Sequence, residues 1–526
     1  MRIGIIQTFM DYHRRGLPNS GPLQTGIGPL IAGCLPEHED IHIVHESLGR
    51  PDWTREYDLL FISCLHSEFD RARQISHYWR RRGATTVLGG TIASTYPQLC
   101  APYFDSIAVG DGESVIPRIY EDFKQHGRLQ RVYTGGSYRG ENMPVPRFDL
   151  IGSKQMVPLS FEVTRGCPFQ CDFCSLSAIG TRFHTRPLET LVRDVDAGRR
   201  MLRGKVPDWK LKIAMLLDNN IAGSMSYHRE FCRTMETLDL QWAAAITFNA
   251  VSNKECVRMM AQAGARMLFT GLESFNPEAL AEMNKHQNVL DDTRRAVDLC
   301  HENGIALISA LLLNAKVDTV EYIRSIPRKL EESGLMVPAF FAFECPLPGT
   351  PLFHRMASAP QPAFLPNALL CDFNGNEMVL RPERETLQDF VGAYKETLAE
   401  VTSAKSKLKQ IWTNAPGFLQ RGQYSTALTD AFLHWSAVFR KPVPGRTYIT
   451  GTDVPMPELF DVPFTDADFR TEEERRMILE PWRITDSEGR VLPQWRSSDR
   501  VYGSKGLINP ELLARKAESD YEFANR

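Results

Sequence analysis

Short apolar segments alternate with helical segments along most of this 526-residue chain, and the alternation limits the folds available to it. In residues 1–140 the strand-like segments are RIGIIQT, DIHIVHE, YDLLFISCL, TTVLGG and SIAVGDGE. The residues between them have helical spacing. This pattern predicts an α/β fold with a doubly wound, Rossmann-like sheet, which binds ligands beyond the carboxyl ends of its strands.

The alternation resumes after a segment rich in Gly, Pro, Asn and Ser, which is typical of a linker. The later strand-like segments are LSFEVT, LKIAMLL, QWAAAITF, ARMLFTG, IALISALLL and VPAFFAFE. Six strand–helix units predict a partial parallel (β/α)6 barrel with ligands at the carboxyl ends of its strands. We therefore expect a Rossmann-like domain at 1–140, a linker at 141–158, the barrel at 159–375 and a mainly helical accessory region at 376–526.

The composition is that of an ordinary globular protein. With 61 Lys and Arg against 64 Asp and Glu, the formal charge is −3, which gives no indication of a nucleic-acid partner. The N-terminal apolar run is too short for a signal peptide and no stretch is long enough to span a membrane, so we expect a cytoplasmic location. Eleven cysteines without a secretion signal indicate reduced thiols and metal ligands.

Three of these cysteines are grouped in TRGCPFQCDFCSLS, as Cys167, Cys171 and Cys174. A structural zinc site would need a second ligand pair downstream, and the sequence has none. The spacing C-x3-C-x2-C at the end of the first barrel strand instead suits a 4Fe-4S cluster, with three irons held by thiolates. The fourth iron would then be open to another ligand.

This loop resembles that of the radical S-adenosylmethionine (SAM) enzymes, whose open iron binds the amino and carboxylate groups of SAM. Phe173, immediately before the third cysteine, also matches. The phrases PVPRFDL, LLDNNIAG, FTGLESFNPEALAEMNKHQN and CPLPGTPL, together with YDLLFISCL, TVLGG and SIAVGDGES, are similar to the cobalamin-binding branch, closest to the hopanoid methylases. The resemblance spans residues 1–400. IALISALLLNAK departs from it, because it lacks the glycine-rich phrase that the methylases usually carry there.

The resemblance implies three cofactors: the cluster, SAM and cobalamin. It further implies that the reduced cluster cleaves SAM to a 5′-deoxyadenosyl radical that abstracts hydrogen from an unactivated carbon, to which methylcobalamin then delivers methyl. Asp218, Asn219 and Glu273 would contact the polar parts of SAM. The structural alternatives are strand-end turn residues for the first two and a neighbour of a helix N-cap for Glu273.

A second resemblance concerns cobalamin itself. Asp11, His13 and Gly16 spell D-x-H-x-x-G, the pattern with which cobalamin-dependent mutases and methionine synthase supply a histidine to cobalt. His13 would then be a cobalt ligand oriented by Asp11, although most radical SAM cobalamin enzymes have no histidine there. The companion elements that would make room for the nucleotide tail are Ser63, Leu65, Gly89 and Gly90, and Gly110 lies beyond another strand end.

The sequence thus favours a radical SAM C-methyltransferase acting on a small-molecule or lipid substrate, supplied with electrons by a flavodoxin or ferredoxin. Two alternatives remain open: a cobalamin-linked cyclase or rearrangement enzyme without methyl transfer, and a non-catalytic iron–sulfur electron-transfer protein. We interpret Cys345, at the end of the last barrel strand, as an inert apolar residue in preference to a nucleophile. Substrate selectivity is expected to reside in the C-terminal region.

Overall fold

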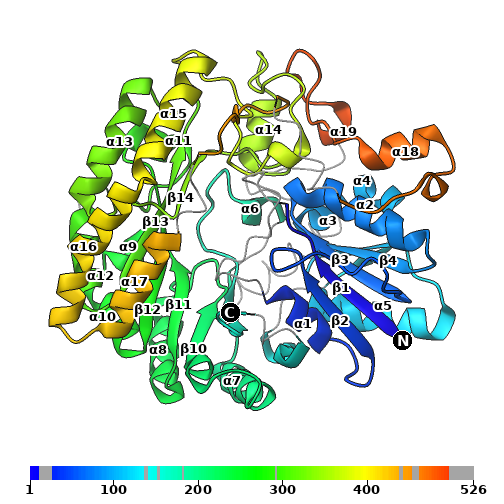
Figure 1. The fold of residues 1–526 in the computed structure, drawn as a ribbon, viewed down its shortest axis with the longest axis horizontal. Coiled ribbons are helices and arrows are strands. Elements are labelled where there is room, and N and C mark those ends of the chain that lie inside the picture. The colour runs from blue at the N-terminus through cyan, green and yellow to red at the C-terminus, as the bar shows by residue number, and fades with distance from the viewer. Residues whose placement is uncertain are drawn as a thin grey trace, which may run out of the picture.

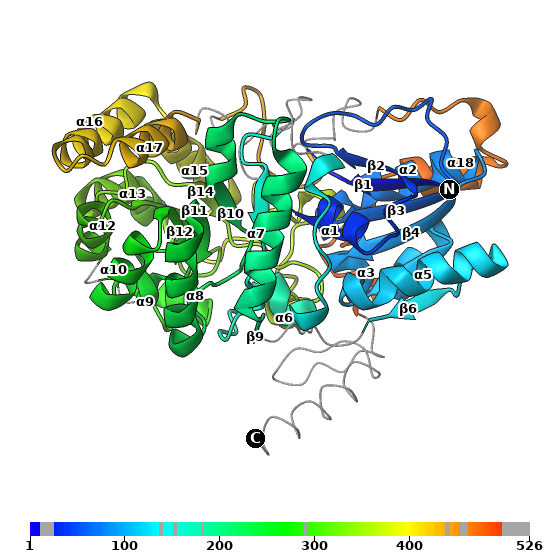
Figure 2. The ribbon, with the colours of Figure 1, turned by 90° about the horizontal axis from the view of Figure 1, so that it is seen from below.

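Two six-stranded parallel sheets lie side by side in the computed structural model, each with helices packed against it (Figure 1). The structure describes residues 1–10, 26–135, 140–150, 155–179, 183–288, 290, 293–436, 442–452 and 461–496. Figure 2 shows the same division from below, with the helices of the two sheets on opposite sides of the molecule.

The first sheet has the strand order β2-β1-β3-β4-β5-β6, and all its neighbouring strands are parallel. Its strands are β1 (Arg2–Gln7), β2 (Asp40–His45), β3 (Leu59–Cys64), β4 (Thr85–Gly90), β5 (Ser106–Val109) and β6 (Val132–Thr134). Its helices are α1 (Ile27–Gly33), α2 (Phe69–Arg80), α3 (Thr91–Thr95), α4 (Pro97–Cys100) and α5 (Gly112–His126). The doubly wound prediction is confirmed, and the order reverses between β1 and β3, where such sheets bind ligands.

The second sheet runs β14-β13-β12-β11-β10-β7, again with every pair parallel. Its strands are β7 (Leu159–Phe161), β10 (Ile213–Leu216), β11 (Gln241–Ile246), β12 (Ala265–Glu273), β13 (Ala306–Leu313) and β14 (Phe340–Phe343). The strand order follows the chain order and the sheet does not close on itself. The predicted partial (β/α)6 barrel is therefore confirmed.

Helices cover the outer face of this second sheet. They are α7 (Leu188–Leu202), α8 (Met225–Leu238), α9 (Phe248–Val251), α10 (Lys254–Gln262), α11 (Pro277–Glu282), α12 (Thr293–Glu302) and α13 (Val320–Ser333). The helix α14 (Pro351–Ala357) lies apart from them, on the side of α6 (Ser175–Ile179; Figure 1). Between β7 and α7 the chain forms a short hairpin, β8 (Thr164–Arg165) and β9 (His184–Thr185), with α6 inside it. Buried apolar side chains recur at helical spacing, for example Leu191 and Val195 on α7, which is why these segments form helices against the sheet.

The C-terminal region is mainly helical, as predicted. It contains α15 (Leu387–Val401), α16 (Ala404–Gln420), α17 (Tyr424–Ser436), α18 (Glu472–Leu479) and α19 (Pro493–Arg496). α15 packs beside β14, where Tyr394 Oη donates to the carbonyl of Phe341 at 3.2 Å. The chain then returns to the first sheet, where the amide of Trp482 donates to Asp70 of α2 at 3.2 Å. Figure 1 shows α18 beside α2, one of the helices that cover the first sheet.

The strand β6, only three residues long, was not predicted, because a strand this short carries too little of an alternating pattern to be recognised.

Among the described residues, no helix is long and apolar enough to cross a membrane.

Candidate functional site

The three grouped cysteines lie in the loop between β8 and α6, just beyond the carboxyl end of β7. Backbone hydrogen bonds from distant elements hold this loop: the amide of Asp172 donates to the carbonyl of Met283 at 3.2 Å, and that of Leu352 donates to Asp172 at 3.0 Å. Within the loop the amide of Cys174 donates to the carbonyl of Cys171 at 3.2 Å. The thiols are therefore placed by the ends of α11 and α14 as well as by local sequence.

Burial raises the pKa of all three thiols, that of Cys174 to about 11. Bare thiols in this position would stay protonated, so a bound metal group is needed to favour the thiolates. Within the described part of the chain, no three His, Cys, Asp or Glu side chains converge closely enough to hold one metal ion. A 4Fe-4S cluster does not require such convergence, since each cysteine binds a different iron.

Amide side chains from two other segments donate to the sulfurs. Asn220 Nδ2 lies 3.8 Å from Cys167 Sγ, and Gln287 Nε2 lies 3.7 Å from Cys171 Sγ. Hydrogen bonds of this kind to ligating sulfurs tune the potential of an iron–sulfur cluster. Neither residue was selected from the sequence as a site residue, although LLDNNIAG and NKHQN, which contain them, were quoted for the family resemblance.

A buried ion pair between Lys285 and Glu273 lies beside the cysteines. Burial alone would lower the pKa of Lys285, but Glu273 and the thiols of Cys171 and Cys174 raise it above its usual value. The ammonium is 5.8 Å from the ring centroid of Phe173, so it sits against the cysteine loop as a fixed positive charge. Lys285 is a third residue that sequence reasoning did not select.

Glu273 ends β12 with φ of 65°, a left-handed conformation that is uncommon for a residue other than glycine. Asn288 stabilises the preceding backbone, because its Nδ2 donates to the carbonyls of Gly271 at 2.9 Å and Leu272 at 2.8 Å. Conformations of this kind persist where the surroundings enforce them and often mark functional sites. The strand end thus aims the Glu273 carboxylate towards Lys285.

Asp218 and Asn219 differ in their surroundings. Asp218 is buried, and its Oδ1 accepts hydrogen bonds from the amide of Val163 at 3.1 Å and from Thr164 Oγ1 at 2.7 Å, as well as from the amide of Thr164. Burial raises its pKa to about 7. Its carboxyl therefore supports the backbone that leads into the cysteine loop. Asn219 is exposed, and its neighbour Asn220 is the residue that reaches Cys167.

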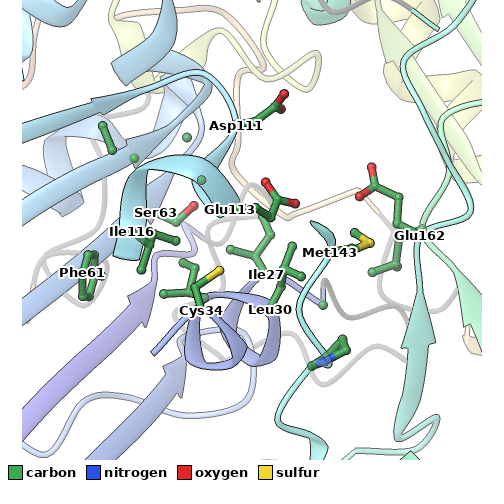
Figure 3. A pocket seen from close by; sticks show the side chains of 18 of the residues that line it. Ile27, Leu30, Cys34, Phe61, Ser63, Asp111, Glu113, Ile116, Met143 and Glu162 are labelled. Atoms are coloured by element: carbon green, nitrogen blue, oxygen red, sulfur yellow. The ribbon is translucent and has the colours of Figure 1, made fainter. Parts of the chain in front are cut away.

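A pocket of about 440 Å³ lies between the carboxyl edge of the first sheet and β7 (Figure 3). Four of the residues predicted to surround cobalamin line it, namely Ser63, Gly89, Gly90 and Gly110. Leu65 is not among the lining residues and is largely exposed. Asp11, His13 and Gly16 lie outside the described residues.

Two of the lining glycines, Gly90 and Gly89, have different structural roles. Gly90 has φ of 101°, and a Cβ there would collide with the backbone of Cys64 on the neighbouring strand β3. A Cβ on Gly89, opposite Ser63 in the sheet register, would meet no atom within 4 Å. The missing side chain at Gly89 therefore enlarges the pocket.

Charged residues from both sheets meet at this pocket. Arg165 Nη1 is 2.8 Å from Asp111 Oδ1, and its Nη2 is 2.5 Å from Glu113 Oε1 and 2.6 Å from Glu162 Oε2. Figure 3 shows Glu162 on the opposite side of the pocket from Asp111 and Glu113. Arg165 is two residues before Cys167, so one side chain connects the cysteine loop to the first sheet.

Residues 161–326, from β7 to α13, match the model of the Radical SAM superfamily. The chain contains a radical SAM domain. The predicted radical SAM enzyme is thereby confirmed, together with the 4Fe-4S cluster and SAM that the superfamily uses. The cysteine loop lies within the matched residues.

Curated relatives extend the similarity beyond this domain. The bacteriochlorophyllide d C-8(2)-methyltransferase of Chlorobaculum tepidum is 25% identical over 352 residues, which cover 64% of this chain and 77% of that protein. The hopanoid C-2 methylase of Rhodopseudomonas palustris is 24% identical over 344 residues, covering 62% of this chain and 63% of the methylase. The predicted resemblance to this branch is confirmed.

Solved structures share the fold of the radical SAM domain and the first sheet together. The methyltransferase TsrM from Kitasatospora setae, solved with tryptophan and a SAM analogue, matches with a TM-score of 0.56 and 16% identity, over 76% of this chain and 89% of TsrM. The cobalamin-dependent enzyme OxsB, with aqua-cobalamin bound, matches with a TM-score of 0.56 and 13% identity, over 81% of this chain and 72% of OxsB.

Proposed function

We propose that this chain is a cobalamin-dependent radical SAM methyltransferase that binds cobalamin in the pocket between its two sheets. The observation that carries the proposal is that the pocket shares Glu162 and Arg165 with the segment leading into Cys167. A cobalamin in the pocket and a cluster on the cysteine loop would then adjoin one another. The names of the relatives and the cobalamin bound by OxsB support this assignment.

The residues of the pocket fit cobalamin. The pocket opens along the strand ends, where the glycines let a large ring approach the backbone. The carboxylates of Asp111, Glu113 and Glu162 can accept hydrogen bonds from the amide side chains of the corrin ring. In this arrangement residues 1–140 would form the cobalamin domain, 141–158 the linker, 159–375 the domain for cluster and SAM, and 376–526 an accessory domain for substrate selection.

The cysteine loop fits a 4Fe-4S cluster with SAM as the additional ligand. Cys167, Cys171 and Cys174 would bind iron, and the charge of Lys285 compensates the negative charge that three thiolates bring into a buried site. Glu273, Phe173 and Asn219 are proposed to border SAM. Asp218, by contrast, is proposed to act through the backbone of Val163 and Thr164.

When bound, the reduced cluster supplies the electron that cleaves SAM, and cobalamin supplies the methyl group. The protein's own residues position these groups. Arg165 holds the cysteine loop against the first sheet, and Ile27, Leu30 and Ile116 give the space between them an apolar lining. We propose an unactivated carbon of a small-molecule or lipid substrate as the methyl acceptor, and a flavodoxin or ferredoxin as the electron donor.

The proposal can be tested with Gly89→Leu, which places a bulky side chain in the pocket at a position where an added Cβ meets no protein atom within 4 Å. Reconstituted wild type should bind cobalamin, and the variant should lose it while retaining iron and SAM cleavage. The matched control is Gly392→Leu on α15, where an added Cβ also meets no atom within 4 Å. Equal cobalamin content in all three proteins would contradict the location. Absence of S-adenosylhomocysteine among the products would favour the cyclase or rearrangement alternative.

A further inference from the structure

The helices α16 and α17 form an antiparallel hairpin that exposes an unusual amount of apolar surface. Half of the exposed large hydrophobic side chains among the described residues lie on these two helices. They are Leu408, Trp412, Leu419, Tyr424, Leu428, Phe432 and Trp435. Scattered exposed hydrophobic residues are normal on a protein surface, but a concentration of this kind marks an interaction site.

On each helix these residues share one face. Leu408, Trp412 and Leu419 are separated by four and seven residues along α16, which places them on a single stripe. The stripe on α17 runs from Tyr424 to Trp435 in steps of four, four and three residues. The side chains of Trp412 and Leu428 are both 73% exposed. Both stripes therefore face solvent and are not the borders of a buried core face.

The opposite faces of the same helices hold the hairpin to the protein. Asn414 Nδ2 donates to Asp430 Oδ1 at 3.1 Å between the two helices, and both side chains are buried. Thr426 Oγ1 donates at 2.8 Å to the carbonyl of Gly304, which precedes β13. The hairpin therefore sits at the amino ends of the barrel strands, whereas the cysteine loop follows a carboxyl end. Figures 1 and 2 both show it well separated from α6.

Charge on the hairpin is positive. Between residues 403 and 436 the lysines and arginines are Lys405, Lys407, Lys409 and Arg421, of which Lys407 is buried, and the single acidic residue, Asp430, is buried too. Lys409 pairs with Glu331 of α13, and Lys405 and Arg421 are exposed beside the apolar stripes. Surfaces that enter the headgroup region of a bilayer combine tryptophan and tyrosine with lysine and arginine, as this hairpin does.

We propose that the α16–α17 hairpin docks this protein onto the surface of an anionic lipid membrane. The two helices would lie in the plane of the interface, with the apolar stripes among the acyl chains and the basic side chains at the headgroups. A second copy of the chain is the less favoured occupant, because lysine is depleted in protein–protein interfaces. Docking through the end of the barrel away from the cysteine loop would leave the cofactor pocket clear of the bilayer.

The test is flotation of the purified full chain with phosphatidylcholine vesicles, with or without phosphatidylglycerol. Wild type should float with the anionic vesicles, and Trp412→Glu combined with Leu428→Glu should weaken binding by about tenfold or more, because two charges enter the acyl region. Lys405→Gln with Arg421→Gln should weaken binding and reduce its dependence on salt. Trp209→Glu is the control, since Trp209 is 57% exposed outside the hairpin and its substitution should leave binding unchanged.

Failure of wild type to float with anionic vesicles would overturn the proposal, as would equal flotation of the Trp412 and Leu428 variant. Analytical ultracentrifugation of wild type and of the Trp412 and Leu428 variant tests whether a second copy of the chain binds this surface. A wild-type dimer that the double substitution converts to a monomer would assign the surface to a second copy instead. Because cofactor content is measured on the same samples, failure of membrane binding is distinguishable from failure of the methyltransferase assignment.

Discussion

The guanidinium of Arg165, two residues before Cys167, lies 2.8 Å from the carboxylate of Asp111 at the carboxyl edge of the first sheet. Burial by itself would raise the pKa of Asp111, and Arg165 opposes that rise. The same guanidinium also pairs with Glu113 and Glu162. This cluster of charges couples the position of the cysteine loop to the cobalamin pocket proposed above.

Replacing Arg165 should therefore loosen the contact between the cysteine loop and the first sheet, and it should also destabilise the protein. Arg165→Leu leaves partly buried carboxylates without their cation and should reduce the free energy of unfolding by about 3 kcal/mol. Urea denaturation at neutral pH measures the loss. Arg229→Leu, which breaks an exposed pair with Glu255, is the control and should cost less than about 1 kcal/mol. Equal effects of the two substitutions would show that the Arg165 cluster contributes no more than a surface ion pair.

The three loop cysteines should each be indispensable for the cluster. Cys167→Ala, Cys171→Ala or Cys174→Ala removes one of three thiolates with no replacement nearby, so iron content and 5′-deoxyadenosine formation should be lost. Cys232→Ala and Cys256→Ala alter buried thiols on α8 and α10 and should retain both. Iron and sulfide assays after anaerobic reconstitution provide the measurement. Full iron content in a loop variant would refute the assignment of that cysteine.

Glu273 should matter for SAM more than for the cluster. Glu273→Gln keeps the shape of the side chain but removes the charge that faces Lys285, so SAM affinity should fall while iron content stays unchanged. Calorimetric titration of the reconstituted protein with SAM measures the change. Glu278→Gln on the exposed part of α11 is a matched control. If Glu273→Gln bound SAM as wild type does, Glu273 would have only a structural role.

The buried carboxyl of Asp218 should make stability depend on pH. Its pKa is raised by burial from its usual value near 4 to about 7, so the folded state binds this proton more tightly than the unfolded state. Its contribution to stability is full below about pH 4 and is lost as the pH rises towards 7, by a few kcal/mol. Asp218→Asn keeps an acceptor for Val163 and Thr164 and should flatten the profile over that range. An unchanged profile in thermal unfolding would contradict the raised pKa.

The role of His13 remains a prediction from the sequence, because residues 11–25 lie outside the described part of the chain. If His13 ligates cobalt, protein reconstituted with cob(II)alamin should show splitting from an axial nitrogen in its electron paramagnetic resonance spectrum. His13→Ala should remove that splitting. A spectrum without nitrogen splitting would exclude His13 as a ligand and leave the radical SAM assignment unaffected.

Much of the architecture was predictable because it is encoded over short distances along the chain. Eleven of the twelve strands of the two large sheets coincide with apolar segments recognised from the sequence, and β6 was missed only for its length. The cysteine spacing is equally local, so the family resemblance of the cysteine loop could be recognised without a structure. The glycines at strand ends, selected from the sequence, also line the pocket at the carboxyl edge of the first sheet.

Only the tertiary structure decided which side chains complete the site. Asn220, Lys285 and Gln287 reach the cysteines from segments 53 to 116 residues away, and periodicity says nothing about which polar residues meet across such distances. The choice of Asn220 over its neighbour Asn219 depends on the direction in which the chain leaves β10. Arg165 meets Asp111 because the two sheets pack at one pocket. Local patterns determine elements, whereas contacts between elements depend on how their surfaces fit together.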